Sequence, residues 1–219
     1  MLRSFDYLIS VIVIIIFFPI LTPFVVIKIL VDGFPLLYIS ERIGLNNKPF
    51  RVYKFRTMIN DKNKIEEYIN TKHPNGGYEQ LSVNAPIYSK LGRIFEIFQF
   101  VELPQFINII LGQMSIVGNR PLPKKINDNL ISQFSFEKIS SRMDSLPGIT
   151  GIVQITGKNE LSDSERLKLE TLYCDYLKKN KVSKILRLNI LIILETFIQI
   201  VLLKKLTVFK NLIIKEINN

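Results

Sequence analysis

Residues 98–121 read Phe-Gln-Phe-Val-Glu-Leu-Pro-Gln-Phe-Ile-Asn-Ile-Ile-Leu-Gly-Gln-Met-Ser-Ile-Val-Gly-Asn-Arg-Pro. This pattern predicts a short helix that carries Glu102 near its start, with Pro104 in the first turn, where a missing N–H costs nothing. Gly112 follows the apolar run and is a natural place for the helix to end. A glycine turn then presents Arg120 just beyond that helix. A carboxylate and an arginine so placed suit a bound metal and a bound phosphate, respectively.

Upstream of this stretch, two short alternating runs at 37–40 and 50–55 flank a turn rich in glycine and asparagine. This arrangement predicts a β-hairpin. Lys54 and Arg56 fall on one face of the second strand at period two, so both could contact a single phosphate. The alternative is that these cations are the solvated face of a strand.

A glycine-rich loop lies downstream, where residues 146–159 read Leu-Pro-Gly-Ile-Thr-Gly-Ile-Val-Gln-Ile-Thr-Gly-Lys-Asn. Glycines in such a loop let the backbone approach a ligand closely.

The composition limits the class of protein. The chain has 219 residues, which is enough for one domain with a substantial core, and 47% of them are hydrophobic. Its formal net charge of +10 implies an anionic partner such as a phospholipid surface or a phosphorylated substrate. Nucleic acid is not expected, because no helix-turn-helix, zinc-finger or RNA-binding signature is present. The one cysteine, Cys174, excludes an intrachain disulfide and suits a small buried side chain, while the one histidine, His73, lies in a polar loop and is not expected to act as a base.

The segment from Tyr7 to Leu30 is almost wholly apolar and long enough to span a bilayer of ~30 Å as a straight helix. Pro19 and Pro23 fall in its middle, and each favours a kink. Two topologies follow: a straight span, or a re-entrant helix that dips into one leaflet and returns. Positive charge on both flanks is compatible with both ends being cytoplasmic and favours the re-entrant form.

The remaining patterns are helical. Helices are predicted at 60–70, at 124–141 and from a capping box at Ser162 through residue 179. Residues 182–205 are apolar on most faces, and a narrow polar stripe comprises Lys184, Arg187, Glu195 and Gln199. That stripe predicts an amphipathic helix in the membrane interface, with a second transmembrane span as the alternative. The predicted fold class is α+β: a re-entrant membrane helix at 1–30, then a mainly helical cytoplasmic domain at 31–219 with a small β-hairpin and interfacial helices.

The three motifs together resemble the bacterial sugar transferases, the polyprenyl-phosphate phosphoglycosyl transferases of the small monotopic form. The family pattern reads Asp-Glu-Leu-Pro-Gln, an apolar helix, and Gly-Asp-Met-Ser-x-Val-Gly-Pro-Arg-Pro. The matching positions are Glu102, Leu103, Pro104, Gln105, Asn108, Gly112, Met114, Ser115, Val117, Gly118, Arg120 and Pro121. The stretch Glu41-Arg42-x-Gly44 and the run from Lys54 to Met58 resemble a second family signature, and the glycine-rich loop at 146–159 a third.

The resemblance implies an enzyme that moves a sugar-1-phosphate from a UDP-sugar to undecaprenyl phosphate, for surface glycan biosynthesis. Such an enzyme works at the cytoplasmic face of the bacterial inner membrane. In the family an aspartate attacks the β-phosphate, UMP leaves, and the adjacent glutamate helps to hold Mg²⁺. Carried over to this chain, Glu102 would be the Mg²⁺ ligand. The substrate-binding candidates are Lys54, Arg56, Arg120, Gln154 and Lys158.

The chain departs from the family pattern where the chemistry occurs. Val101 stands at the position of the nucleophilic aspartate, and an isopropyl group has no lone pair with which to attack phosphorus. Glu96 replaces an arginine of the usual phosphate cluster, Leu146 replaces another, and Lys158 replaces an arginine with loss of the bidentate fork. We therefore expect a chain with the family fold that is catalytically inactive. The alternatives are an active transferase that uses Glu102 or another residue, and a non-catalytic membrane partner of an active transferase.

Overall fold

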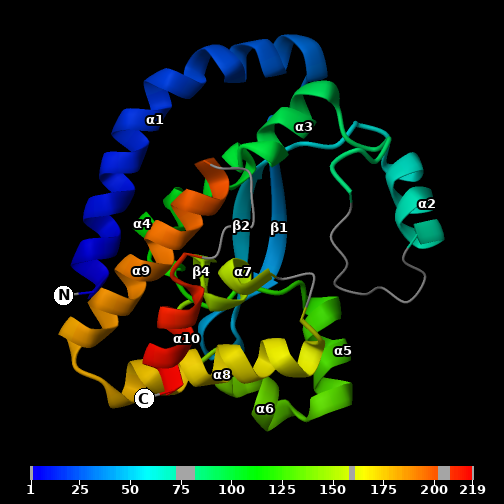
Figure 1. Ribbon diagram of the computed structural model, residues 1–219. Coiled ribbons are helices and arrows are strands. Elements are labelled where there is room, and N and C mark those ends of the chain that lie inside the picture. The colour runs from blue at the N-terminus through cyan, green and yellow to red at the C-terminus, as the bar shows by residue number, and fades with distance from the viewer. Residues whose placement is uncertain (1, 73–81, 158–160, 202–207, 219) are drawn as a thin grey trace.

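The computed structural model of the chain describes residues 2–72, 82–157, 161–201 and 208–218, and confirms an α+β architecture dominated by helices (Figure 1). The helices are α1 (Leu2–Asp32), α2 (Lys62–Lys72), α3 (Lys90–Ile97), α4 (Gln105–Ile110), α5 (Lys124–Phe134), α6 (Phe136–Ser141), α7 (Ile152–Gly157), α8 (Asp163–Lys179), α9 (Val182–Val201) and α10 (Lys210–Asn218). The strands are β1 (Leu37–Ile43), β2 (Pro49–Phe55), β3 (Ser115–Val117) and β4 (Gly148–Thr150), and the 3₁₀ turns are η1 (Leu45–Asn47) and η2 (Phe100–Glu102).

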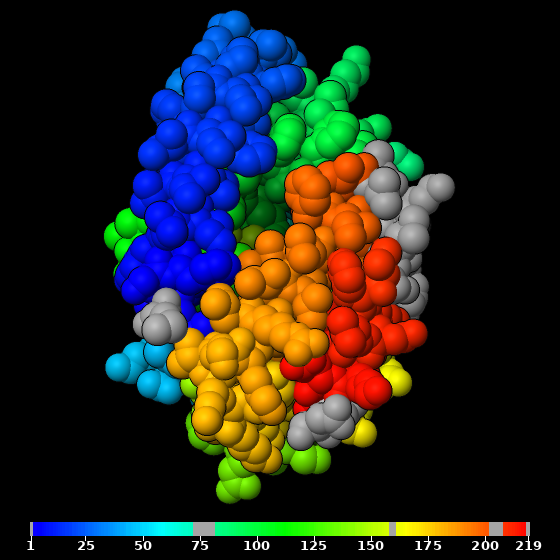
Figure 2. Space-filling model, turned by 60° about the vertical axis from the view of Figure 1, so that its left-hand side comes forward, coloured from blue at the N-terminus to red at the C-terminus, as the bar shows by residue number. Residues whose placement is uncertain are grey.

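Helix α1 runs along one side of the molecule and curves over its top (Figures 1 and 2). Pro19 and Pro23 lie inside it and account for the bend, because each removes a backbone hydrogen bond. Large apolar side chains are exposed along its length, among them Ile15, Phe18 and Leu30. By length and composition, α1 could cross a membrane. An exposed surface of this kind suits contact with lipid.

The first turns of α1 are bonded to the body of the protein. Arg3 donates to the carbonyl of Met114 at 3.1 Å. The buried carboxylate of Asp6 accepts from the Ser115 hydroxyl at 2.7 Å and from the backbone N–H of Ile116 at 3.3 Å. Arg3 and Asp6 therefore face strand β3 and the turn before it, which attaches the start of α1 to the domain.

The last turn of α1 is bonded to the same body. Lys28 is fully buried, forms an ion pair with Asp32 at 2.6 Å and lies over the ring of Phe95. Asp32 also accepts from the hydroxyl of Ser89, the N-cap residue of α3, at 2.7 Å. Both ends of the apolar helix are thus attached to one compact domain.

The predicted hairpin is confirmed and is longer than expected at its first strand. β1 and β2 pair in antiparallel fashion, with a register that runs from Leu37 opposite Phe55 to Ile43 opposite Pro49. On the free edge of β2, the fully buried Asn108 of α4 takes the place of a third strand. Its side chain accepts from the N–H of Tyr53 at 3.2 Å and donates to the carbonyl of Arg51 at 2.7 Å.

Two short strands, β3 and β4, lie beside the main apolar core of the domain. β3 and β4 pair in parallel, and the main apolar core packs around them against α7, α9 and α10. The glycine-rich loop was expected to bring its backbone close to a ligand. Two of its glycines lie close to Gly118: a Cβ on Gly148 would lie 2.1 Å from the nitrogen of Gly118, and one on Gly151 would lie 2.1 Å from the Gly118 carbonyl oxygen. These glycines allow two backbone segments to pack together.

The helix predictions differ in outcome. A surface helix forms as α2, and the capping box at Ser162 and Glu165 opens α8 with both of its hydrogen bonds. The helix predicted at 124–141 is wrong as one element, because Ser135 adopts φ of 79° and separates α5 from α6. That angle is strained for a residue with a Cβ atom.

The polar stripe predicted on α9 is not a single exposed face. Lys184 and Arg187 are exposed, but Glu195 is fully buried and accepts from the N–H of Phe209 at 2.9 Å. Gln199 donates to the carbonyl of Ile155 in α7 at 2.9 Å. The stripe divides because α7 and α10 pack against the second half of α9. The predicted helix 182–205 is described as far as Val201, and its last four positions lie outside the described residues.

Replacing Asn108 with leucine tests the junction between the hairpin and α4. Asn108→Leu removes the side-chain partner of the N–H of Tyr53 and of the carbonyl of Arg51, and a group that loses its partner costs up to roughly 1–3 kcal/mol. We expect the free energy of unfolding to fall by about 2–5 kcal/mol, measured by denaturant unfolding of the detergent-solubilised chain. The matched control is Asn129→Leu on the exposed face of α5. Equal effects of the two substitutions would contradict this role for Asn108.

Candidate functional site

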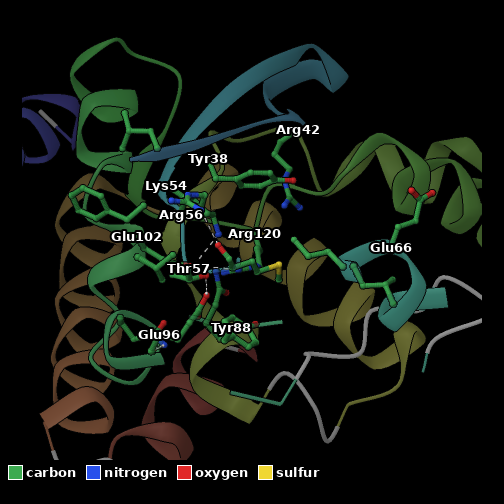
Figure 3. A pocket seen from close by; sticks show the side chains of 18 of the residues that line it. Tyr38, Arg42, Lys54, Arg56, Thr57, Glu66, Tyr88, Glu96, Glu102 and Arg120 are labelled. Atoms are coloured by element: carbon green, nitrogen blue, oxygen red, sulfur yellow. Dashed lines mark hydrogen bonds and ion pairs between the residues drawn. The ribbon is translucent and has the colours of Figure 1, made fainter. Parts of the chain in front are cut away.

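A cavity of about 760 Å³ opens beside the hairpin (Figure 3). Its walls come from β1 and β2, α2, η2, the segment after β3, and helices α7 and α8. Its lining includes most of the residues that the sequence predicted for the site: Lys54, Arg56, Val101, Glu102, Arg120 and Gln154. The remaining candidate, Lys158, lies outside the described residues.

Glu102 is the centre of an ion-pair cluster in this cavity. One of its carboxylate oxygens, Oε1, lies 3.3 Å from the Lys54 ammonium nitrogen and 3.2 Å from Nη2 of Arg120. Burial lowers the pKa of Lys54 from its ordinary value; Glu102 opposes this shift, whereas the nearby charges of Arg120 and Arg42 add to it. Two cations from separate segments, Lys54 and Arg120, therefore share one anion, and the charge of Arg42 lies near them.

Val101 precedes Glu102 in the η2 turn and lines the same cavity, with 6% of its surface exposed. Glu96 also lines the cavity, and its carboxylate accepts from the Thr57 hydroxyl at 2.9 Å (Figure 3). The pKa of Tyr88 is raised to about 12, first by burial and then by the negative charge of Glu96. The negative charge of Glu96 therefore disfavours binding of an anion in this part of the cavity.

Arg56 lines the cavity, but its guanidinium is used within the protein. It donates to the carbonyls of Asp32 and Gly33 at 2.7 Å each, and to that of Pro35 at 2.6 Å. Lys54 and Arg56 do not meet at one partner in these contacts, because β2 ends at Phe55 and Arg56 follows the chain toward the end of α1. The structure thus gives Arg56 a role in holding α1 in place.

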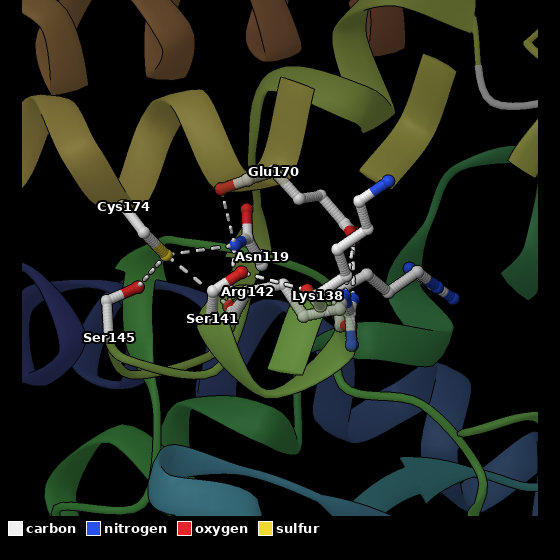
Figure 4. A network of polar contacts seen from close by, with 8 residues as sticks. Asn119, Lys138, Ser141, Arg142, Ser145, Glu170 and Cys174 are labelled. Carbon is white, nitrogen blue, oxygen red and sulfur yellow. Dashed lines mark hydrogen bonds and ion pairs between the residues drawn. The ribbon is translucent and has the colours of Figure 1, made fainter. Parts of the chain in front are cut away.

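The backbone of Arg120 is hydrogen-bonded to a buried ion pair between Arg142 and Glu170, which Figure 4 shows. Arg142, which is fully buried, binds the Glu170 carboxylate through Nε and Nη2 and donates to the carbonyl of Arg120 at 2.8 Å. The side-chain amide of Asn119 donates to the carbonyls of Arg142 and Glu170 at 2.7 Å and 3.0 Å. Cys174 is buried beside this network, as predicted, and burial raises the pKa of its thiol.

Three residues that contribute to the site were not among the candidates. Arg42 and Gln105 line a small hollow together with Lys54 and Arg120, and Arg142 donates a hydrogen bond to the carbonyl of Arg120. Arg42 and Gln105 lie within stretches that match family motifs, so the motif match could have identified them as site residues. Arg142 has no motif around it in this chain, and only the three-dimensional contacts reveal it.

Residues 1–203 match the sequence profile of the family described as Bacterial sugar transferase. The chain belongs to the bacterial sugar transferase family. It is 33% identical to the exopolysaccharide production protein ExoY of Sinorhizobium fredii over 176 residues, which cover 78% of this chain and 75% of ExoY. It is 34% identical to the galactosyl transferase CpsE of Streptococcus agalactiae over 155 residues, which cover 68% of this chain and 32% of CpsE.

A further relative is named an undecaprenyl-phosphate galactose phosphotransferase, from Salmonella typhimurium. It is 29% identical over 175 residues, which cover 78% of this chain and 36% of that protein. The relatives support the family function of sugar phosphotransfer to undecaprenyl phosphate in exopolysaccharide synthesis. Position 101 of this sugar transferase family member nevertheless holds valine.

The Mg²⁺ expected at Glu102 is poorly matched by the described side chains. Within those residues, no group of three or more His, Cys, Asp and Glu side chains could hold a metal ion. Val101 offers no ligand atom, and Glu102 already pairs with two cations. A Mg²⁺ ion at the usual ~2.1 Å from a Glu102 oxygen would lie near both Lys54 and Arg120. Two like unit charges ~4 Å apart repel each other by roughly 4 kcal/mol at an effective dielectric constant of 20, so each cation would disfavour the metal ion. The donor set fits an anion better than a divalent cation.

The ion pair beneath Arg120 gives a test of the scaffold. Arg142→Leu leaves Glu170 buried without its partner, and such a loss costs about 3–5 kcal/mol of stability. The double variant Arg142→Leu/Glu170→Leu buries no charge, so we expect it to be more stable than the single variant. Denaturant unfolding of the wild type and the two variants measures both effects.

Lys178→Leu is the control, because Lys178 and Asp144 form an exposed ion pair that should contribute little. A double variant less stable than Arg142→Leu would contradict the interpretation.

Proposed function

We propose that this chain binds a phosphorylated ligand of the sugar transferase pathway at the membrane surface and does not transfer phosphosugar through an aspartyl intermediate. The observation that carries the proposal is Val101, which lines the cavity beside Glu102 at the position of the family nucleophile. Nucleophilic catalysis needs a lone pair at that position, and valine supplies none. A site that keeps its cations without its nucleophile is suited to binding.

Neither nearby carboxylate is well placed to act instead. To attack phosphorus, Glu102 would have to leave both Lys54 and Arg120, which it contacts in the structure. Ion pairing also lowers the availability of its oxygen lone pairs. Glu96 accepts from Thr57 and stands where the family carries an arginine that favours the diphosphate. An active enzyme that uses Glu102 is the second candidate, supported by the location of Glu102 in the wall of the cavity.

For the membrane arrangement, we infer that α1 enters and leaves one leaflet on the cytoplasmic face of the inner membrane. The support is that Arg3 and Asp6 bond to β3 and its preceding turn, whereas Asp32 bonds to the start of α3. A helix that crossed the bilayer would separate these two anchors by the full thickness of the membrane. The bend at Pro19 and Pro23 lets one helix keep both anchors.

Release of UMP tests the functional proposal. We expect purified chain, supplied with undecaprenyl phosphate, Mg²⁺ and a panel of UDP-sugars, to release no more UMP than a Glu102→Gln variant. The panel is run beside Val101→Asp, in which turnover would show that the lost aspartate alone explains the inactivity. Turnover by the unaltered chain that Glu102→Gln abolishes would instead establish the active-enzyme alternative.

Thiol labelling tests the topology. Ser4, in the first turn of α1, and Lys62, at the start of α2, are exposed and lie on either side of the apolar part of α1 in sequence. We expect Ser4→Cys and Lys62→Cys to react with a membrane-impermeant maleimide in inverted inner-membrane vesicles and to be protected in intact spheroplasts. Gln133→Cys on α5 reports the side of the domain, and buried Cys174 sets the background. Labelling of Ser4→Cys in spheroplasts would show that α1 spans the bilayer.

A further inference from the structure

A small hollow adjoins the main cavity and shares Arg42, Lys54 and Arg120 with its lining. Its accessible volume is about 10 Å³, which is close to the room that one water-sized atom needs. Its polar lining consists of Arg42, Lys54, Arg120 and Gln105, and Val52, Pro121 and Gly148 complete the wall. Three of its four polar side chains are cations that can only donate hydrogen bonds.

Gln105 supplies the observation that points to a ligand. It is the first residue of α4, only 3% of its surface is exposed, and its Nε2 has no hydrogen-bond partner within the described parts of the chain. A buried amide N–H without a partner is unfavourable, and native structures seldom keep one. Here the unused donor belongs to a residue that lines the same hollow as the three cations. An acceptor atom in the hollow would satisfy it.

The charges define the acceptor. Arg42, Lys54 and Arg120 carry three positive charges, and Glu102 carries one negative charge, so the cluster has a net charge of about +2. A phosphate monoester carries about −1.5 to −2 at neutral pH and presents three terminal oxygens. A monoester bound here would place one oxygen in the hollow and direct its ester group into the main cavity. A second phosphate further along that cavity would face the carboxylate of Glu96.

We propose that Arg42, Lys54, Gln105 and Arg120 bind one phosphate monoester without a divalent metal. Lys54 and Arg120 both pair with Oε1 of the Glu102 carboxylate and supply positive charge where a metal ion would otherwise do so. This inference rests on the proposed function, because it requires that the cavity take a phosphorylated ligand. The ligand is either a lipid monophosphate or a soluble nucleotide or sugar monophosphate.

The experiment is calorimetric titration of the full chain in detergent, in EDTA and again in excess Mg²⁺. Farnesyl phosphate represents the lipid monophosphates, UMP represents the soluble ones, and short-chain phosphatidylglycerol represents phosphodiesters. We expect at least one monoester to bind with an affinity that agrees within about twofold between EDTA and Mg²⁺, and more tightly than the diester. The tighter of the two monoesters identifies whether the ligand comes from the membrane or from solution, and either supports the site.

Gln105→Leu separates a binding role from a structural one. A hydrogen bond to a charged group corresponds to a change in affinity of roughly tenfold or more, so we expect at least that loss for the monoester. The melting temperature should stay the same or rise, because the substitution removes an unpaired buried donor. Gln133→Leu on the exposed face of α5 is the matched control and should change neither quantity.

Three results would overturn the inference: a loss of affinity greater than about tenfold in EDTA, equal binding of the diester, or unchanged affinity in Gln105→Leu. Its failure is distinct from failure of the proposed function. UMP release with metal-independent binding would refute only the proposed function. Metal-dependent binding without UMP release would refute only this inference.

Discussion

The side-chain amide of Asn108 joins strand β2 to helix α4, and the geometry of the site depends on this junction. Within the described residues β2 pairs with one strand, β1, and Asn108 satisfies a backbone N–H and a backbone carbonyl on its other edge. The junction fixes the distance between the strand that carries Lys54 and the turn that carries Glu102. Because the amide is fully buried, both backbone groups depend on it for their hydrogen bonds. A short contact between two side chains from different elements is possible only because their backbones are locked together.

The other half of the site is fixed by a different kind of interaction. Arg120 lies on an irregular segment with no strand or helix of its own, and the buried Arg142–Glu170 pair holds its carbonyl. Close packing of Gly118 against the glycine-rich loop adds a steric constraint, since neither backbone could approach the other with a side chain between them. The hydrogen bonds of Asn108 therefore position the wall of the cavity that carries Lys54 and Glu102. The Arg142–Glu170 ion pair and the close packing of Gly118 position the wall that carries Arg120.

What the sequence could predict followed from local rules. Alternation predicted the hairpin, and the capping box at Ser162 predicted the start of α8, because both signals come from residues near one another in the chain. The period-two pattern placed Lys54 and Arg56 on one face, but it could not show that the strand ends between them. The burial of Glu195 depends on contacts near α10, since Glu195 accepts from the N–H of Phe209, 14 residues later in the chain. The surroundings of the unpaired Gln105 donor depend on five chain segments that meet at one hollow. Periodicity carries no information about such long-range contacts. The motif match located most of the cavity because it encodes those contacts indirectly.

The polar inner side of α1 also sets an order of events during synthesis. Arg3 and Asp6 find their partners at Met114 and Ser115, and 111 positions separate the first of these pairs in the chain. When α1 leaves the ribosome, those partners have not yet been made. Until then, the side chains of Arg3 and Asp6 must form hydrogen bonds with water or other polar groups. The bonds that attach the start of α1 to the domain can form only after Met114, Ser115 and Ile116 have been made. The start of the first element to be synthesised is therefore joined to the rest of the fold only after more than half of the chain exists.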